Sequence, residues 1–465
     1  MRRKRRDKNS KSSKVVPGIM ISLCALIIIY LGMTIYFKNN FYFGSTINGI
    51  NIAGKTVEEV EKELSSQIDT YSLELEERGD IKEQIKAIDI GLKYDGNKIK
   101  ELKDEQNTNS WVPGLFKKKD PVMSKVVTYD EELLNKSFDK LSCFDSSNKI
   151  EPKNASFNYT DDGYEIVDEV KGNIINKDAL HDSIVDAIIN SKSKINLETE
   201  NCYKEPQYNS KSQEVIDTKD LLDKYTDLKI TYSLGNDTEV VDGSKIHNWL
   251  HVNDKMEVTF DEEKISNYVY KISSMFNTFE DTRGFVTTTK KTIKVSGGNY
   301  GWIVDKSKEV KDLIQTIKNG QSITKEPIYS QKAMSRDKND IGNTYVEINL
   351  TKQHLWFYKN GALVVEGDFV SGNASTNTLT PAGTYILNYK EKNATLKGED
   401  YSSPVEFWMP FNGNIGIHDA SWRTEFGKNI YMTNGSHGCI NSPYELASTI
   451  FKNIDAGTPI VCFYE

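Results

Sequence analysis

The stretch Ser436-His437-Gly438-Cys439-Ile440-Asn441, with Gly416-Ile417-His418 upstream of it, is the most informative part of the chain. A thiolate is the nucleophilic form of cysteine, and a nearby histidine can take the proton of the thiol. Because Gly438 precedes Cys439, backbone N–H groups at these two positions are able to converge on an anionic oxygen. The pattern predicts an acyl-transfer site.

The roles within this site follow from the residue types. Cys439 is the predicted nucleophile. His418 is the predicted general base and later acid, because imidazole titrates near neutral pH. His437 is expected to hold the loop or its electrostatics, and a direct role in proton transfer stays open. Asp419 is a candidate for orienting His418, but neighbouring strand residues point to opposite faces, so its backbone carbonyl is as good a candidate as its carboxylate.

The remaining candidates form two groups. Ser436 and Gly438 are expected to support the nucleophile or an oxyanion. A second group lies near the site in the sequence, and its aromatic members either line a substrate groove or cap the fold. This substrate group consists of Trp422, Asn441, Tyr401 and Trp408.

A zinc site is the rival use of the same side chains, with His418, His437 and Cys439 as ligands. Catalytic zinc takes three protein ligands with an activating carboxylate nearby, and the sequence has neither a His-Glu-x-x-His nor a Cys-x-x-Cys motif. We therefore expect no metal and no other cofactor.

Five cysteines are scattered along the chain without metal-type spacing. We expect Cys143, Cys202 and Cys462 to be free, buried, apolar thiols. A bridge between Cys143 and Cys202 is the alternative in an exported protein.

Residues 343–465 are expected to form a mainly-β, sandwich-like domain. Runs of β-branched and aromatic residues such as Tyr345-Val346-Glu347-Ile348 alternate with turns such as Lys359-Asn360-Gly361. The convincing helix runs from Pro443 to Asn453, with Ser442 as the expected N-cap.

The motifs resemble the signature of the L,D-transpeptidases, which are bacterial cell-wall enzymes. That signature is a histidine, a spacer, then Ser/Thr-His-Gly-Cys, an apolar residue and Asn or Arg; residues 419–435 form the spacer here. The resemblance covers about 343–465 and includes Thr380-Pro381-Ala382-Gly383-Thr384-Tyr385.

The resemblance implies a reaction on peptidoglycan stem peptides. Cys439 would form a thioester with the third residue of one stem, releasing the terminal D-alanine, and the acyl group would pass to the side-chain amine of another stem's third residue. Carbapenem-type β-lactams are the implied inhibitors. If water accepts the acyl group, the enzyme is an L,D-carboxypeptidase. A non-catalytic, wall-binding anchor is the alternative outside the enzymes.

Two stretches before this domain repeat one another. Gly172-Asn173-Ile174-Ile175-Asn176-Lys177 corresponds to Gly301-Trp302-Ile303-Val304-Asp305-Lys306, and each stretch ends in Lys-Glu-Pro-x-Tyr. We expect two related α+β modules, at 44–210 and 220–333, with an insertion around Trp111 in the first.

The modules resemble peptidoglycan-binding repeats often placed between the anchor and the catalytic domain of such enzymes. A role as spacers is an equal alternative, because the repeated residues occupy turn and core positions. The polar run 334–342 lacks periodicity and is expected to be a linker.

The first part of the chain predicts a membrane anchor. Residues 1–14 carry a net charge of +7 and form an expected cytoplasmic tail; the whole chain carries −8, so the rest carries −15. So acidic a body argues against a nucleic-acid partner. The 23 residues of 15–37 are uncharged and long enough for a hydrocarbon core of about 30 Å.

An uncleaved anchor is favoured over a signal peptide, because Lys38-Asn39-Asn40-Phe41 follows the span without small residues. The basic flank predicts that everything after Lys38 lies outside the cytoplasmic membrane, facing the cell wall.

Overall fold

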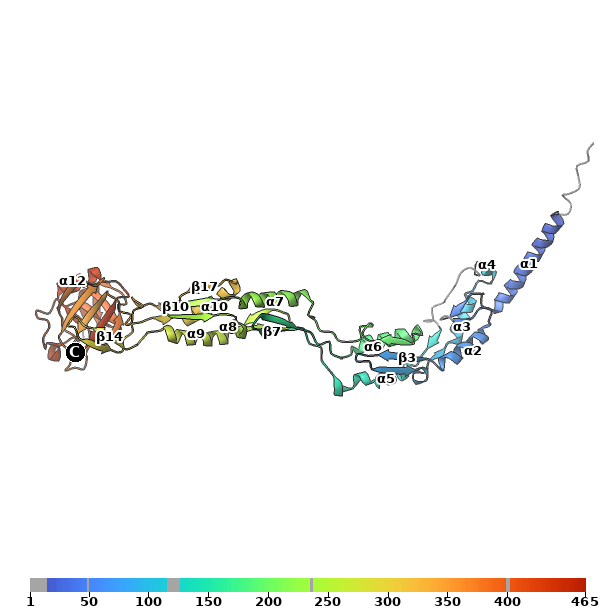
Figure 1. Ribbon diagram of the computed structural model, residues 1–465, viewed down its shortest axis with the longest axis horizontal. Helices are drawn as coiled ribbons and strands as arrows, with labels where there is room; N and C mark the ends of the chain where they lie inside the picture. The colour runs from blue at the N-terminus through green and yellow to red at the C-terminus, as the bar shows by residue number, and fades with distance from the viewer. Residues whose placement is uncertain (1–14, 48–49, 115–125, 235–236, 399–401) are drawn as a thin grey trace, which may run out of the picture. The chain divides into compact units, whose positions relative to one another are not determined.

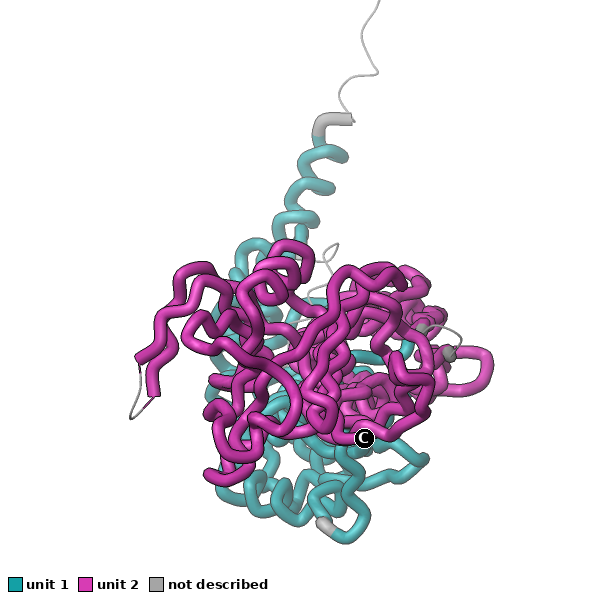
Figure 2. The backbone as a smooth tube through the Cα atoms, turned by 90° about the vertical axis from the view of Figure 1, so that its left-hand side faces the viewer, with its two compact units in different colours: residues 1–156, 167–212 teal, residues 157–166, 213–465 magenta. Residues whose placement is uncertain are grey.

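The computed structural model describes residues 15–47, 50–114, 126–234, 237–398 and 402–465 (Figure 1). The predicted tail 1–14 and the candidate Tyr401 lie outside these residues. The chain divides into two compact units (Figure 2): Met1–Ser156 with Val167–Ser212, and Phe157–Ile166 with Gln213–Glu465.

Helix α1 (Val15–Asn39) is long and apolar, as expected from the sequence. Its part Pro17–Asn39 is sufficient in length and composition to cross a membrane. Most of its side chains are exposed, but Phe37 near its end is fully buried. The last turn of α1 therefore belongs to the core of the first unit.

Two hydrophobic cores lie among the described residues of the first unit. One includes Phe41, Ile47, Val60, Leu64 and Ile99, and the other is built around a three-stranded sheet. The elements of the first unit that follow α1 are β1 (Thr46–Ile47), β2 (Ile50–Asn51), α2 (Val57–Ile68), β3 (Ser72–Glu76), β4 (Lys82–Lys86), η1 (Ala87–Ile90), β5 (Lys93–Tyr94), α3 (Gly96–Asp104), η2 (Thr108–Ser110), α4 (Trp111–Gly114), β6 (Val127–Thr128), α5 (Glu131–Phe138), η4 (Ser142–Phe144), η5 (Ser146–Asn148), α6 (Lys177–Ile189) and β9 (Lys194–Asn196).

The second unit begins with a module that resembles the first in its order of elements. These elements are α7 (Gln213–Thr226), β10 (Ile230–Leu234), β11 (Asp237–Val241), α8 (Gly243–Ile246), η6 (His247–Trp249), β12 (Leu250–Val252), β13 (Val258–Phe260), α9 (Glu262–Phe276), β14 (Arg283–Val286), β15 (Thr292–Val295), β16 (Ile303–Val304), α10 (Lys306–Asn319), β17 (Ile323–Lys325) and β18 (Tyr329–Gln331).

The strand order confirms the repeat. The sheets β4-β3-β9 and β11-β10-β17 both consist of an antiparallel hairpin whose first strand also pairs in parallel with a strand from late in the module. Equivalent helices begin at equivalent caps: Asp130 and Asp261 accept N–H groups at the starts of α5 and α9. The exact module boundaries stay predictions.

A hairpin of the first module belongs to the second unit. It consists of β7 (Ser156–Thr160) and β8 (Gly163–Val167). The backbone N–H of Tyr164 donates to Asp223 Oδ1 at 2.8 Å, and the ring of Tyr159 stacks on His247 with centroids 4.2 Å apart. The hairpin β14–β15 extends in the same manner from the second module and packs on the C-terminal domain through Phe285 and Val295.

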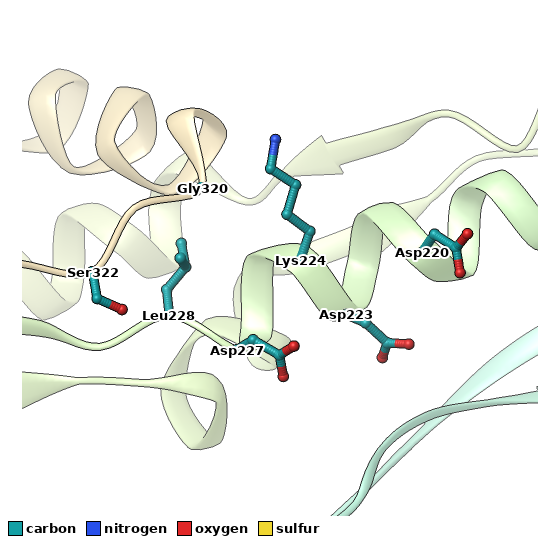
Figure 3. A pocket seen from close by; sticks show the side chains of 7 residues that line it. All are labelled: Asp220, Asp223, Lys224, Asp227, Leu228, Gly320 and Ser322. Carbon is teal, nitrogen blue, oxygen red and sulfur yellow. The ribbon is translucent and has the colours of Figure 1, made fainter.

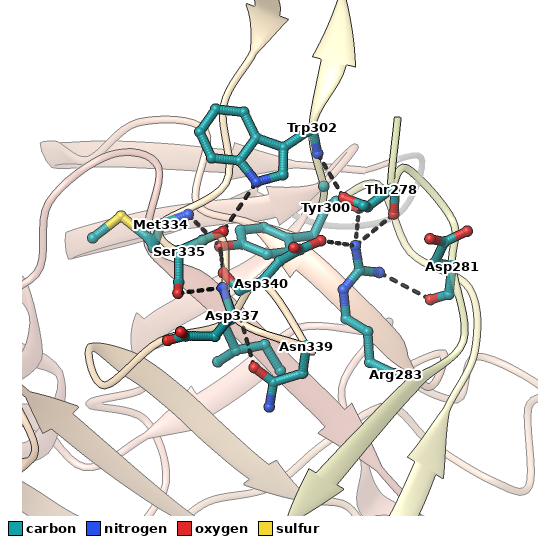
Figure 4. A network of polar contacts seen from close by, with 12 residues as sticks. Thr278, Asp281, Arg283, Tyr300, Trp302, Met334, Ser335, Asp337, Asn339 and Asp340 are labelled. Atoms are coloured by element: carbon teal, nitrogen blue, oxygen red, sulfur yellow. Dashed lines mark hydrogen bonds and ion pairs between the residues drawn. The ribbon is translucent and has the colours of Figure 1, made fainter. Parts of the chain in front are cut away.

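Side chains of the second module hold the segment 334–342, which the sequence predicts to be a linker (Figure 4). Arg283 Nη2 pairs with Asp340 Oδ2 at 3.2 Å, and both side chains are buried. The hydroxyl of Tyr300 donates to the Asp340 carbonyl and accepts the N–H of Met334. Ring contacts add to this order, since the guanidinium of Arg336 lies 3.4 Å from the ring centroid of Trp302.

The C-terminal domain is the predicted β-sandwich with a helix. A five-stranded sheet, β21-β20-β19-β27-β22, faces a four-stranded sheet, β23-β24-β25-β26, across one hydrophobic core. Its elements are β19 (Tyr345–Asn349), β20 (His354–Lys359), β21 (Ala362–Asp368), β22 (Gly383–Ile386), β23 (Glu391–Lys397), β24 (Ser402–Asn412), β25 (Ile415–Asp419), α11 (Tyr431–Asn434), β26 (Ile440–Ser442), α12 (Tyr444–Asn453) and β27 (Pro459–Phe463).

Helix α12 is the helix expected at 443–453. Leu446, Ala447 and Ile450 share its buried face, as their spacing predicts. Ser442 is not its N-cap: Pro443 holds that position, and Ser442 is instead the last residue of β26.

Candidate active site

Two parallel strands bring the predicted catalytic residues together. In the pairing of β25 with β26, His418 lies opposite Asn441, and Cys439 directly precedes β26. Strand β24 pairs with β25 on the other side, where Trp408 lies opposite His418. The long spacer in the sequence is thus closed by sheet pairing, which places His418 on one strand and Cys439 at the start of its neighbour.

The imidazole of His418 is buried and oriented by the backbone. Its Nδ1 lies 2.9 Å from the carbonyl oxygen of Asp419. That nitrogen therefore carries the proton, and Nε2 remains the basic atom. The Asp419 carboxylate has a different task, since its Oδ1 accepts the backbone N–H groups of Glu406 and Phe407 at 2.9 and 2.8 Å.

Burial shifts the pKa of both candidate catalytic groups. It raises the pKa of the Cys439 thiol to about 11 and lowers the pKa of His418 below its ordinary 6.5. Cys439 Sγ lies 3.4 Å from the carbonyl oxygen of Asn414, to which a thiol can donate. Both directions favour a thiol and a neutral imidazole as the resting pair, from which His418 would take the proton of Cys439.

Ser436 and Gly438 shape the loop that carries Cys439. Ser436 Oγ donates to the Cys439 carbonyl at 2.6 Å and accepts the Gly438 N–H at 3.0 Å. Gly438 has a φ of +120°, and a Cβ there would lie 3.1 Å from the Ile415 side chain. Because its N–H already has an acceptor within the loop, Gly438 supports the loop and does not offer this group to an oxyanion.

Thr380 is a supporting residue that the sequence reasoning did not assign. Its fully buried hydroxyl donates to the Gly438 carbonyl at 2.6 Å and accepts the N–H of Gly372 at 3.0 Å. Its sequence signal was its place at the start of the Thr380-Pro381-Ala382-Gly383 motif. Arg423, also missed, holds the segment before Ser436 by donating to the carbonyls of Asn434 and Gly435.

The candidate substrate residues fall into different environments. Trp408 is buried, Trp422 is 50% exposed, and each ring centroid lies 5.9 Å from that of His418. Asn441 is buried, and its backbone pairs with Val370. His437 is exposed. Of the two tryptophans beside the base, Trp422 is the one with a large surface open to a substrate.

The geometry also bears on the metal and disulfide alternatives. Within the described ranges, no group of three or more His, Cys, Asp or Glu residues could hold a metal ion. All five cysteines are free; Cys202 and Cys462 are buried as expected, Cys143 is partly buried, and no Cys143–Cys202 bridge forms.

A hollow on the second module has an acidic lining (Figure 3). Asp220, Asp223 and Asp227 contribute from α7 and its end, and Ser322 from the segment before β17. Asp223 is already paired with Lys219 and with the Tyr164 N–H. The hollow thus adjoins the contact made by hairpin β7–β8, and Asp223 has a structural role there.

Comparison with known proteins adds to this geometry. The family model "L,D-transpeptidase catalytic domain" matches residues 343–462, and that of the "Putative peptidoglycan binding domain" matches 83–196 and 208–325. The crystal structure of an Enterococcus faecium L,D-transpeptidase mutant is 35% identical, with 54% of this chain and 100% of that chain covered and a TM-score of 0.44. The chain belongs to the L,D-transpeptidase family.

Two further L,D-transpeptidase structures are similar. The Ldtfm–avibactam carbamoyl enzyme is 36% identical over 54% of this chain and 98% of that chain, with a TM-score of 0.45. The E. faecium catalytic domain acylated by ertapenem is 44% identical over 26% of this chain and 98% of that chain, with a TM-score of 0.25. No curated protein matches the chain.

Proposed function

We propose that this L,D-transpeptidase joins peptidoglycan stem peptides through a thioester on Cys439, with His418 as the proton carrier. The observation that carries the proposal is the contact between His418 Nδ1 and the Asp419 carbonyl at 2.9 Å. It leaves Nε2 basic on the strand next to Cys439, which is the arrangement that nucleophilic catalysis by a thiol requires.

In acylation, the Cys439 proton passes to His418 Nε2 as the sulfur attacks the carbonyl carbon of the third stem residue. The C–N bond to the terminal D-alanine then breaks, and the imidazolium protonates the departing amine. Because the resting thiol has a pKa of about 11, attack and proton transfer must be coupled, and the base is required throughout.

In deacylation, the side-chain amine of another stem's third residue attacks the thioester. His418 takes the proton of that amine, the C–S bond breaks, and Cys439 recovers its proton. Attack by water would instead give an L,D-carboxypeptidase. Trp422 is our candidate for excluding water, since its half-exposed ring lies beside that of His418.

We assign the stabilisation of the oxyanion to backbone N–H groups of the loop around Cys439. The Gly438 N–H is not one of them, because it donates to Ser436 Oγ. We assign His437 to the electrostatics of the loop and not to proton transfer, because it is exposed. We further propose that carbapenem-type β-lactams acylate Cys439, because ertapenem acylates the related E. faecium catalytic domain.

We propose that α1 anchors the chain in the cytoplasmic membrane, with its N-terminus in the cytoplasm and the catalytic domain facing the wall. The uncharged span and the basic residues before it support this orientation. The matches to a peptidoglycan-binding family support a role for both modules in holding wall polymer. We place the modules at 44–210 and 220–333 and the catalytic domain at 343–465.

The test uses the full chain in detergent and disaccharide stem peptides, followed by mass spectrometry. We expect a dimer linked between third residues, loss of D-alanine, and a covalent intermediate on Cys439. Cys439→Ala should remove all three while leaving the circular dichroism spectrum unchanged. Cross-linked dimer from Cys439→Ala would refute the mechanism.

The same spectra separate the alternatives. Shortened monomers without dimers identify a carboxypeptidase. Unchanged stem peptides, together with no carbapenem adduct on a folded protein, identify a non-catalytic wall-binding anchor.

A further inference from the structure

An apolar hollow of the first unit is lined by residues of α1 and of the short helix α4. It has a volume of about 370 Å³, and its lining includes Leu23, Leu26, Ile27, Trp111 and Val112. Val112 is 42% exposed, and the α1 side chains around it are exposed as well. An open apolar surface of this kind requires an apolar partner.

The segment Asn107–Gly114 is fastened to the face of α1. The ring centroid of Trp111 lies 5.8 Å from that of Tyr30 and 5.9 Å from that of Phe37. The Tyr30 hydroxyl donates to the carbonyl of Asn109 at 2.7 Å. These contacts fix the level of Trp111 along the helix.

That level lies inside the hydrocarbon if α1 spans the bilayer. Residues 17–37 extend over about 31 Å at 1.5 Å per residue, which matches a hydrocarbon core of about 30 Å. Tyr30 then lies about 10 Å below the outer boundary by the same rise per residue. Trp111, in contact with both Tyr30 and Phe37, occupies the outer part of the core.

The segment is chemically suited to this position. Asn107–Gly114 contains no charged residue, and Trp is enriched where hydrocarbon meets headgroups. Backbone groups within a bilayer need internal partners. Here the Ser110 N–H bonds to the Asn107 carbonyl, the Asn109 N–H bonds to Asn107 Oδ1, and the Tyr30 hydroxyl bonds to the Asn109 carbonyl.

We propose that Val112 enters the outer leaflet beside α1, with the largely buried ring of Trp111 at the same level. Lipid acyl chains then fill the hollow that α1, Trp111 and Val112 line. This inference rests on the proposed membrane anchor. The core that includes Phe41 and Ile47 would then lie at the membrane surface. Two elements, α1 and the segment Asn107–Gly114, would attach it to the bilayer.

The experiment uses the full chain in phosphatidylcholine–phosphatidylglycerol vesicles whose acyl chains are brominated near the headgroup. Flotation first tests the anchor. Tryptophan fluorescence then tests the inference, because bromine quenches only rings that it approaches. We expect partial quenching of the six tryptophans and loss of the quenched component in Trp111→Phe.

Two variants in the Trp111→Phe background sharpen the result. Val112→Trp should restore quenching, and its matched control Ile88→Trp, at a residue that is 83% exposed in the same unit, should not. A chain that floats but shows no Trp111-dependent quenching refutes the inference and leaves the anchor in place. A chain that does not float refutes the anchor and the inference with it.

Discussion

His418 Nδ1 contacts the backbone oxygen of Asp419 at 2.9 Å, while the carboxylate of the same residue binds two N–H groups of β24. One residue therefore orients the imidazole of His418 with its main chain and joins two strands with its side chain. A carbonyl oxygen holds this imidazole, and the neighbouring carboxylate binds the N–H groups of Glu406 and Phe407.

Asp419→Asn should consequently reduce the rate of acyl transfer by less than about 10-fold, whereas loss of a triad carboxylate costs about 10⁴-fold. Its stability should fall by about 1–3 kcal/mol, since the N–H groups of Glu406 and Phe407 lose a charged acceptor. Steady-state kinetics and urea denaturation measure the two effects. A 10⁴-fold loss of rate in a folded variant would contradict this division of roles.

His418→Ala should lower acyl transfer about 10²- to 10⁴-fold, the usual range for a lost general acid–base group. His437→Ala, its matched control two residues from Cys439, should cost far less because His437 is exposed. Single-turnover acylation by a carbapenem measures both variants. Equal losses would show that the roles are assigned wrongly.

The pH dependence of acylation should follow the neutral imidazole. Because burial lowers the pKa of His418 below 6.5, the base stays mostly unprotonated at pH 6.5, and the rate should fall only at lower pH. Because burial raises the pKa of Cys439 to about 11, no thiolate limb should appear between pH 7 and 9. An acidic limb centred above pH 6.5 would contradict the buried, neutral histidine.

The free energy of unfolding should also fall at acidic pH. An unfolded chain binds a proton on His418 near its ordinary pKa of 6.5, and the folded chain does so only at lower pH. The unfolded state therefore gains protons first as the pH falls below 6.5, and this contribution to stability declines there. The decline should be absent from His418→Gln in denaturation series from pH 7 to 5.

Thr380→Val keeps the shape of the side chain but removes its hydroxyl. The Gly438 carbonyl and the Gly372 N–H would lose their partner, at a cost of about 1–3 kcal/mol. We expect lower stability and slower acylation by Cys439, with Thr376→Val, an exposed neighbour, as the control. Thermal unfolding and carbapenem acylation rates report the two effects, and wild-type values for both would exclude a supporting role.

Arg283→Met should destabilise the second unit by about 3–5 kcal/mol, because it leaves Asp340 buried without its ion-pair partner. Lys308→Met is the control: its pair with Asp305 involves a largely exposed lysine and is worth about 0–1 kcal/mol. Urea denaturation of the ectodomain measures both. Equal midpoints would show that the buried contact does not stabilise the unit.

Local patterns predicted much of the catalytic domain. The buried face of α12 and the Cys439 motif depend on neighbours within a few residues, and these follow from spacing alone. The ordered conformation of 334–342 cannot be predicted from spacing alone, because Asp340 is held by Arg283 and Tyr300, which lie 57 and 40 residues away. Thr380 was not predicted for the same reason, because its hydrogen bond to Gly438 joins residues that are 58 positions apart.

The resting thiol was also beyond local reasoning. The sequence offers His418 and His437 as bases, but the pKa of Cys439 depends on its burial beside Trp408, Val405 and Ala394. The packing of the folded sheet therefore raises the pKa of the Cys439 thiol and keeps it protonated.

A contact between the second module and the catalytic domain also limits where such chains can be recombined. Thr288, in the turn of the β14–β15 hairpin, donates its N–H and its hydroxyl to the buried carboxylate of Glu347 in β19. A gene fusion with its crossover at 342 would pair Glu347 with a foreign hairpin lacking these donors. A crossover at Ser212 would keep Thr288 and Glu347 in one segment but would separate hairpin β7–β8 from Asp223 and His247. The contacts of both hairpins therefore restrict where such chains can be joined.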